Sequence, residues 1–303
     1  MENSSEKDVA QKEPHPASRI LYPASDRSSC VKPLLDVSGL SVHFGSSTDP
    51  VRAVDCVDFQ IFDGEIVALV GESGSGKSIS ALALAQLVPE PAGRIVGGKV
   101  FFQGLENLTL KPSELRKLRG ERIAYIFQEP ATSLNPVFTV GWQIAEAIRL
   151  HRKGVKVKAE VEKLLADVGL PDPKRTANAY PHELSGGMQQ RAMIAMALAC
   201  DPDLLIADEP TTALDVTVQK QILELLVDLR EKRGLSILLI THNLGIVAEV
   251  ADRIYVMTNG KIVESGETKT VLRTPQHDYT KKLLKAVPRL RKGSPQITQI
   301  FTD

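Results

Sequence analysis

One eight-residue run, Gly71 to Ser78, constrains the fold of this 303-residue chain more than any other feature. Its residues, Gly-Glu-Ser-Gly-Ser-Gly-Lys-Ser, fit the phosphate-binding pattern G-x-x-x-x-G-K-S/T at every fixed position. Before it, Ile66 to Val70 is a short apolar run typical of a strand buried on both faces. After it, Ser78 to Val88 is rich in Ala and Leu and predicts a helix. A strand, a phosphate loop and a helix in succession predict an α/β domain that binds a nucleotide.

The phosphate loop supplies both backbone and side-chain groups to a nucleotide. Gly74 and Gly76 let backbone amides approach the phosphates, and the helix beginning near Lys77 points its positive end at them. We expect Lys77 to reach the β- and γ-phosphates and the Ser78 hydroxyl to bind Mg²⁺. The predicted nucleotide-binding loop consists of Gly71, Glu72, Ser73, Gly74, Ser75, Gly76, Lys77 and Ser78.

A second apolar run, Leu204 to Ala207, ends in the acidic pair Asp208 and Glu209. Four apolar residues directly before the pair argue for a buried strand rather than a solvated loop. In open α/β sheets, ligands bind beyond the carboxyl ends of the strands. We therefore expect Asp208 to hold the Mg²⁺ shell and Glu209 to polarise an attacking water.

The rest of the chain predicts a mainly parallel sheet flanked by helices. Alternation of apolar and polar residues, or short apolar runs, predicts strands at 35–42, 54–61, 98–103, 122–127 and 236–240, and a hairpin of 253–257 with 261–264 across Asn259-Gly260. Helical spacing occupies 143–168, 186–200 and 216–232. Buried strands that alternate with helices favour a parallel sheet, and the absence of internal repeats predicts one catalytic domain.

Composition excludes several other classes of protein. The 37 basic and 37 acidic residues balance, so the chain lacks the net positive charge that would predict nucleic acid as a partner. Three scattered cysteines, Cys30, Cys56 and Cys200, lack metal-ligand spacing and are interpreted as reduced thiols of a cytosolic protein. Residues 1–33 are polar, lack the apolar core of a signal peptide and are expected to be disordered. No run approaches the roughly 18 apolar residues that a membrane span needs.

Between the phosphate loop and the acidic pair lies Leu184-Ser185-Gly186-Gly187-Met188. These three features together resemble the nucleotide-binding subunit of an ATP-binding cassette (ABC) transporter, over about residues 35–288. The resemblance implies an α/β fold: a P-loop NTPase (RecA-like) core with an antiparallel β subdomain and a helical signature subdomain. The ATPase domain would span 34–270, with its helical part at about 129–184, and a C-terminal extension would follow at 271–303.

The other family positions find matches in the same order along the chain. Gln128 matches the Q-loop, which contacts Mg²⁺ and water and couples to the permease, and His242 matches the histidine that contacts the γ-phosphate. Asp215, in Ala213-Leu214-Asp215, matches the D-loop that crosses to the other subunit, and Phe44 matches an aromatic that stacks on adenine. Taken singly, Gln128 also suits a surface position, His242 an ordinary hydrogen-bonded histidine, and Asp215 a helix N-cap.

The resemblance implies that two subunits complete each ATP site. ATP would lie between the phosphate loop of one subunit and Ser185, Gly186 and Gly187 of its partner, because the start of a helix there forms a second anion site. The implied catalytic residues are Glu209, His242, Gln128 and Lys77. The implied metal ligands are Ser78, Gln128 and Asp208.

Residues near the C-terminus narrow the resemblance to the oligopeptide/dipeptide/nickel importer branch. The run Pro275-Gln276-His277-Asp278-Tyr279-Thr280, followed by Leu283, Leu284 and Pro288, resembles the C-terminal extension of that branch. Three further features fit the same branch: Met188, Glu129-Pro130 and Ser133-Leu134-Asn135-Pro136. Some members bind an iron–sulfur cluster through cysteines in this extension. No cysteine follows Cys200 in this chain, so we predict no such cluster.

The implied function is ATP hydrolysis that energises uptake of di- or oligopeptides from the cytoplasmic face of the inner membrane, where the protein would be peripheral. The implied partners are two integral membrane permeases, an identical or homologous ATPase, and an extracytoplasmic solute-binding protein. Import of nickel or another small solute stays open.

Other classes of nucleotide-binding protein fit the sequence less well. A soluble ABC ATPase of DNA repair or translation is disfavoured by the single phosphate loop and by a 77–184 segment too short for a long coiled coil. A GTP-dependent switch ranks last, because the Asn-Lys-x-Asp element that reads guanine in those proteins is absent from the sequence. Trp142 either lies near the permease-docking surface or serves in packing.

Overall fold

The computed structural model describes residues 32–46, 48–129, 133–212 and 214–286. Several sequence predictions concern residues outside these ranges: most of the N-terminal extension with Cys30, Pro130 and Ala213, and the stretch from 287 onward with Pro288. Cys56 and Cys200 are free cysteines. Among the described residues, no helix combines the length and apolar character needed to cross a membrane.

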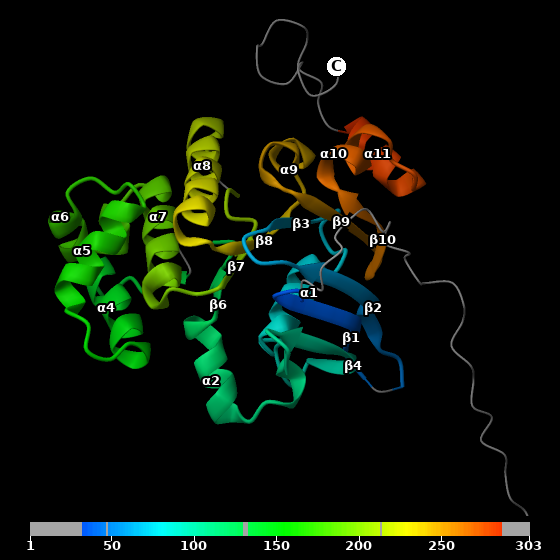
Figure 1. Ribbon diagram of the computed structural model, residues 1–303, viewed down its shortest axis with the longest axis horizontal. Coiled ribbons are helices and arrows are strands. Elements are labelled where there is room, and N and C mark those ends of the chain that lie inside the picture. Colours follow the sequence, from blue (N-terminus) through cyan, green and yellow to red (C-terminus); the bar gives the residue numbers. More distant parts are fainter. Residues whose placement is uncertain (1–31, 47, 130–132, 213, 287–303) are drawn as a thin grey trace, which may run out of the picture. The chain divides into compact units, whose positions relative to one another are not determined.

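A six-stranded sheet, with strand order β10-β9-β3-β8-β7-β6, forms the centre of the fold (Figure 1). Its strands are β3 (Ile66–Val70), β6 (Ile123–Ile126), β7 (Leu204–Asp208), β8 (Ser236–Thr241), β9 (Arg253–Thr258) and β10 (Lys261–Glu267). All neighbours are parallel except β9 and β10, which form the predicted antiparallel hairpin. Every residue of β3, β7 and β8 is buried, which explains the apolar runs that make up β3 and all but the ends of β7 and β8.

A second, antiparallel sheet has the strand order β2-β1-β4-β5 and confirms the expected β subdomain. Its strands are β1 (Leu35–Phe44), β2 (Val51–Ile61), β4 (Gly93–Phe102) and β5 (Leu105–Glu106). This sheet and α1 (Lys77–Leu84) share one hydrophobic core with one face of the central sheet. Helix α1 ends before Val88, earlier than predicted, because Gln86 is left-handed with φ 51° and prolines follow at 89 and 91.

Helices cover the other face of the central sheet. The alternation of side chains along the strands divides the two cores: Leu205 and Leu239 point to the helical side, whereas Ile206 and Leu238 point to the antiparallel sheet. Helices α7 (Gly186–Ala197) and α8 (Val216–Arg233) lie on this side of the sheet. Helices α4 (Val140–His151) and α5 (Val157–Asp167) pack on α7, and α6 (Pro173–Asn178) packs on α4 and α5. The helical stretch predicted at 143–168 is divided into α4 and α5 near Gly154, whose φ is 76°.

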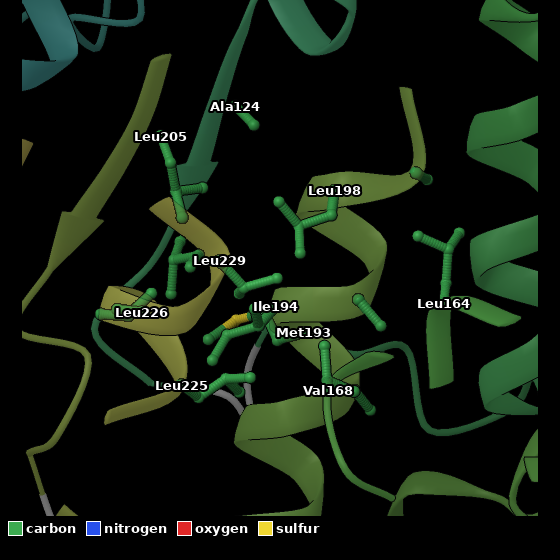
Figure 2. Close-up of a cluster of buried hydrophobic side chains, with 14 of the residues drawn as sticks. Ala124, Leu164, Val168, Met193, Ile194, Leu198, Leu205, Leu225, Leu226 and Leu229 are labelled. Carbon is green, nitrogen blue, oxygen red and sulfur yellow. The ribbon is translucent and has the colours of Figure 1, made fainter. Parts of the chain in front are cut away.

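Helix α7 connects the helical elements to the sheet. Figure 2 shows its Ile194, with Leu198 just after its end, between Leu226 of α8 on one side and Leu164 of α5 on the other. After α7 the chain continues as a 3₁₀ turn (Leu198–Cys200), so the helical stretch predicted at 186–200 is confirmed with a tighter final turn. Because α7 packs on both sides, a movement of its N-terminal turn relative to the sheet would have to be shared with α5 and α8.

The remaining elements are short helices and 3₁₀ turns elsewhere along the chain. They are η1 (Asn107–Thr109), α2 (Pro112–Glu121), η2 (Pro181–Glu183), α9 (Leu244–Val250), α10 (Thr268–Arg273) and α11 (Asp278–Ala286). Helices α2 and α9, which have ten and seven residues, were not predicted from the sequence. Helices α9, α10 and α11 lie beside β9 (Figure 1). Val247 of α9 and Leu272 of α10 are buried in one cluster with residues of β3 and β9, and Tyr279 of α11 packs on the same cluster.

Candidate functional site

The loop Gly71 to Ser78 connects the carboxyl end of β3 to α1, as predicted. Gly76 is the N-cap residue of α1 and has φ 104°, a conformation that glycine adopts without a side-chain penalty. The Lys77 ammonium is buried and donates to the carbonyl oxygens of Gly71 and Glu72, both at 2.9 Å. Burial lowers the pKa of Lys77, and the nearby carboxylates of Glu209 and Asp208 oppose that shift. The loop thus holds the positive charge of Lys77 at the carboxyl end of the central sheet, near Asp208 and Glu209.

Asp208, the last residue of β7, lies beside the phosphate loop. Its Oδ1 accepts a hydrogen bond from the Ser78 hydroxyl at 3.0 Å, and its Oδ2 accepts one from the Tyr125 hydroxyl at 2.8 Å. Burial raises the pKa of Asp208, and the hydrogen bonds from Tyr125 and Ser78 oppose that rise.

The oxygens of Ser78 and Asp208 fit the requirements of Mg²⁺. This ion prefers oxygen ligands in octahedral geometry at about 2.0–2.1 Å, which places neighbouring ligand oxygens about 2.9 Å apart. The 3.0 Å separation of Ser78 Oγ and Asp208 Oδ1 agrees with that spacing. The two residues can therefore hold a divalent cation without rearranging the strand or the loop.

Glu209 gathers side chains from three neighbouring strand ends. Its carboxylate accepts hydrogen bonds from Gln128 Nε2 at 3.1 Å, Thr212 Oγ1 at 2.9 Å and His242 Nδ1 at 3.1 Å. Gln128 follows β6 and His242 follows β8, so the strand order β8-β7-β6 brings both to Glu209. The backbone of Glu209 is left-handed, with φ 45°, and its amide donates to Ile240 at 2.9 Å. This turn rotates Glu209 away from the direction of Asp208.

Hydrogen bonding keeps the Glu209 carboxyl ionised. Burial alone would raise the pKa of Glu209, but the hydrogen bonds from His242 and Thr212, together with the charges of His242 and Lys77, hold it below its ordinary value. An ionised carboxylate is an acceptor only. Glu209 can therefore orient a water molecule by accepting one of its hydrogens.

Six of the predicted site residues meet at this edge of the central sheet: Lys77, Ser78, Gln128, Asp208, Glu209 and His242. Two further participants were missed by the sequence analysis. Thr212 is three residues beyond Glu209, and Tyr125 lies in the aliphatic strand β6. The available signal was a single phenol in a short buried strand whose carboxyl end points to the site. Burial and the neighbouring Asp208 raise the pKa of the Tyr125 hydroxyl, so it stays a donor at neutral pH.

The turn of Ser185, Gly186 and Gly187 belongs to a different surface from the site around the phosphate loop and Glu209. Ser185 caps α7 by accepting a hydrogen bond from the Met188 amide at 3.4 Å, and its side chain is exposed. A Cβ on Gly186 would lie 3.6 Å from Leu214, and one on Gly187 would lie 2.8 Å from Val218. The turn therefore adjoins the segment that starts α8, and the two form one surface.

Asp215 and Phe44 have structural roles that the sequence analysis had left open or not considered. Asp215 is the N-cap of α8, where it accepts a hydrogen bond from the Val218 amide at 2.9 Å. The Phe44 ring is half-buried at the end of β1, and a Cβ on Gly93 would lie 2.7 Å from it. Contact of either residue with nucleotide stays a prediction.

The two glycines of the loop with clear left-handed φ are expected to respond differently to alanine. In Gly74→Ala the added Cβ meets open space, so only the backbone at φ 79° is strained, which should cost about 1–2 kcal/mol of unfolding free energy. In Gly76→Ala the Cβ would lie 2.3 Å from the Ala53 carbonyl oxygen, which adds an overpacking cost of about 1–3 kcal/mol. Urea denaturation of both variants measures the difference. Equal destabilisation would contradict the close approach of β2 to this glycine.

Comparison with known proteins agrees with this geometry. A family model described as "ABC transporter" matches residues 54–212, and one described as "Oligopeptide/dipeptide transporter, C-terminal region" matches residues 263–302. The dipeptide transport ATP-binding protein DppD of Haemophilus influenzae is 51% identical over 269 residues, which cover 88% of this chain and 81% of that protein. DppD of Escherichia coli is 49% identical, with coverage of 88% and 82%.

Solved structures show the same fold. The ATP-binding cassette MJ0796, described as a dimer in a post-hydrolysis state bound to ADP and Pi, matches with a TM-score of 0.69 and 27% identity, over 77% of this chain and 98% of that chain. The protein cbiO1 of Clostridium perfringens, part of the complex cbiONQ, also matches with a TM-score of 0.69, at 26% identity over 80% of this chain and 91% of its own. With a matching family model, relatives of about half identity over most of its length and a cassette fold, this chain belongs to the ABC transporter family, in the branch that carries the oligopeptide/dipeptide C-terminal region.

Proposed function

We propose that this ABC-family ATPase energises the uptake of di- or oligopeptides. The observation that carries the proposal is the 51% identity with a dipeptide transport ATP-binding protein over 88% of the chain. The match of residues 263–302 to the oligopeptide/dipeptide C-terminal region supports the same substrate class. Import of nickel or another small solute remains the second candidate.

The chain is expected to work within an importer that has membrane components, as its relatives are transport proteins. In the proposed assembly, two integral membrane permeases join this chain, a second ATPase that is identical or homologous, and an extracytoplasmic solute-binding protein. The chain would lie peripherally at the cytoplasmic face of the inner membrane. No nucleic acid takes part, in keeping with the balanced charge.

Hydrolysis follows from the side chains gathered at the ends of β6, β7 and β8. Lys77, held by two loop carbonyls, would bind the β- and γ-phosphates. Ser78, Asp208 and Gln128 would hold Mg²⁺, whose positive charge would neutralise phosphate charge. Glu209 would accept a hydrogen bond from water and direct its oxygen at the γ-phosphorus, in line with the departing ADP oxygen.

We propose that His242 acts at the γ-phosphate. Because the ionised Glu209 only accepts, His242 Nδ1 carries the proton of their 3.1 Å bond. The other ring nitrogen, Nε2, can then donate to a phosphate oxygen when the ring is protonated. In that form His242 would bridge Glu209 and the phosphate. It would thereby hold the water oxygen and the γ-phosphorus in the relative position that attack requires.

A second subunit would close the site from the opposite side. Ser185, Gly186 and Gly187 lie at the exposed start of α7, where backbone amides and the helix dipole favour an anion. ATP would lie between this turn and the phosphate loop of the partner, with the adjoining Asp215 segment crossing the same interface. The dimer described for the ADP- and Pi-bound cassette MJ0796 supports this arrangement.

We propose that an aromatic pair at the start of α4 contacts the permease. Phe138 and Trp142 stack with ring centroids 4.0 Å apart and planes 14° apart, and their side chains are 37% and 40% exposed. Val137 beside them is 68% exposed. Partly exposed aromatics of this kind are enriched at protein interfaces. The ring of Trp142 packs on Phe138, and we propose that its exposed apolar surface contacts a permease segment.

Uptake measurements test the proposal directly. A strain that lacks this chain should lose uptake of a labelled dipeptide, and expression of the wild-type chain should restore it. Loss of labelled Ni²⁺ uptake instead would identify nickel as the substrate, and loss of neither would contradict the proposed importer.

A substitution at the aromatic pair tests the permease contact. Trp142→Ser should bind Mg-ATP normally but recover less permease on co-purification. Leu150→Ser, at the far end of α4 and 74% exposed, is the matched control and should recover as much as wild type.

A further inference from the structure

The C-terminal segment is fixed to the central sheet by one carboxylate. Glu264 of β10 accepts hydrogen bonds from the backbone amides of Gln276 at 2.7 Å and His277 at 3.1 Å. His277 Nδ1 in turn accepts from the Tyr279 amide at 3.1 Å. Thr280 is fully buried, and Tyr279 packs on the cluster between β9 and the terminal helices. These contacts hold the start of α11 in a defined position against the sheet.

From this position Tyr279 reaches the phosphate loop. Its hydroxyl oxygen accepts a hydrogen bond from the Glu72 amide at 3.0 Å, across 207 residues of sequence. The same peptide unit carries the Gly71 carbonyl, which accepts from Lys77 Nζ at 2.9 Å. One peptide plane is therefore bonded at one end to α11 and at the other end to the lysine of the phosphate loop.

This chain of bonds orients Lys77. An ammonium has three donors, and two of them are directed at the carbonyl oxygens of Gly71 and Glu72. The third lies 3.5 Å from the Ser75 hydroxyl oxygen. A rotation of the Gly71-Glu72 peptide would therefore shift one of the two short bonds that fix the direction of the ammonium. Hydrogen bonds in series also polarise one another, so a bond at the amide strengthens the one at the carbonyl.

We infer that Tyr279 is a positioning residue for the ATP site: the C-terminal region holds the phosphate loop, through the Gly71-Glu72 peptide, in the conformation that presents Lys77 to the phosphates. The inference rests on the proposed role of Lys77. It gives the C-terminal region a task in ATP binding, through two features of the Pro275 to Thr280 run: backbone amides that Glu264 captures, and a phenol that reaches the loop.

The test removes only the phenol oxygen in the full-length chain. In Tyr279→Phe, loss of one neutral hydrogen bond should raise the KM for Mg-ATP about two- to tenfold. The kcat should stay unchanged, because Lys77 contacts the phosphates in both ground and transition states. Affinity for adenosine, which has no phosphates, should match wild type. The melting temperature without nucleotide should also stay within about 2 °C of wild type, which separates positioning from a general loss of structure.

Two further variants make the outcome decisive. Glu264→Gln weakens the capture of the Gln276 and His277 amides while keeping the phenol, and should raise KM in the same direction. Lys282→Ala, exposed on α11, is the control and should behave as wild type. If Tyr279→Phe does not fold, an unchanged KM in Glu264→Gln overturns the inference.

A Lys77→Ala variant separates this inference from the proposed function. If Lys77→Ala binds Mg-ATP weakly while Tyr279→Phe has wild-type KM, Tyr279 has no positioning role. If Lys77→Ala binds Mg-ATP as tightly as wild type, the assignment of Lys77 to the phosphates fails, and the inference fails with it.

Discussion

Replacing Glu209 by Gln is expected to lower ATP turnover by about 10²- to 10⁴-fold, the range for losing a side chain that acts on the attacking water. Glutamine keeps the size of the side chain and can still accept from Thr212 and Gln128, so the local fold should persist. It lacks the negative charge that orients water. The phosphate loop is unaltered, so affinity for Mg-ATP should stay within about threefold of wild type.

Phosphate release at saturating ATP measures the turnover, and calorimetric titration with Mg-ATP measures the affinity. The control is Glu224→Gln, because Glu224 lies on the exposed side of α8 with its side chain 63% exposed. That variant should retain wild-type turnover. If Glu209→Gln hydrolysed ATP at the wild-type rate, another residue would have to orient the water, and the three hydrogen bonds around Glu209 would be structural only.

Replacing Gly186 by Asp should lower ATP turnover of the assembled transporter at least about tenfold, without affecting ATP binding to the isolated chain. Gly186 is exposed at the first position of α7, and its Cβ would lie 3.6 Å from Leu214, an ordinary contact distance. An acidic residue in the first helical turn is favourable to the helix, so the chain should fold as well as wild type.

The expected loss comes from repulsion between the new carboxylate and the phosphates of ATP held by the partner subunit. Two like charges about 4 Å apart repel by about 4 kcal/mol at the effective dielectric of a protein surface, before screening by salt. Gly186→Asn is the matched control, since it has the same shape without the charge. It should keep most of the activity.

The measurement compares phosphate release by purified transporter complexes with Mg-ATP affinity of the separate chains. The proposed interface predicts a loss in the complex alone, for Asp and not for Asn. Equal turnover of the two variants would place the α7 turn away from the nucleotide. Reduced ATP affinity of the isolated Gly186→Asp chain would instead place the turn in the same-chain site, contrary to the structure.

Local patterns were sufficient for much of the fold. The strand 66–70 has the predicted bounds, and β7 extends its predicted range only by Asp208. Both are buried on two faces, so their apolar runs carry a clear signal. The ends of helices were harder to predict from the sequence. Helix α1 ends before the left-handed Gln86, and Gly154 separates α4 from α5. Short α9 has only seven residues, too few to display a helical period well.

The sequence by itself determined the phosphate loop, the acidic strand end and, by their order, the family resemblance, because these features lie within single short segments. Only the tertiary structure decided that Gln128 and His242 share the Glu209 carboxylate, since that depends on the strand order β8-β7-β6. It alone placed Tyr279 on the Glu72 amide, 207 residues away. Periodicity in a sequence reports which way neighbouring side chains point, whereas contacts between distant segments depend on how the strands and helices pack.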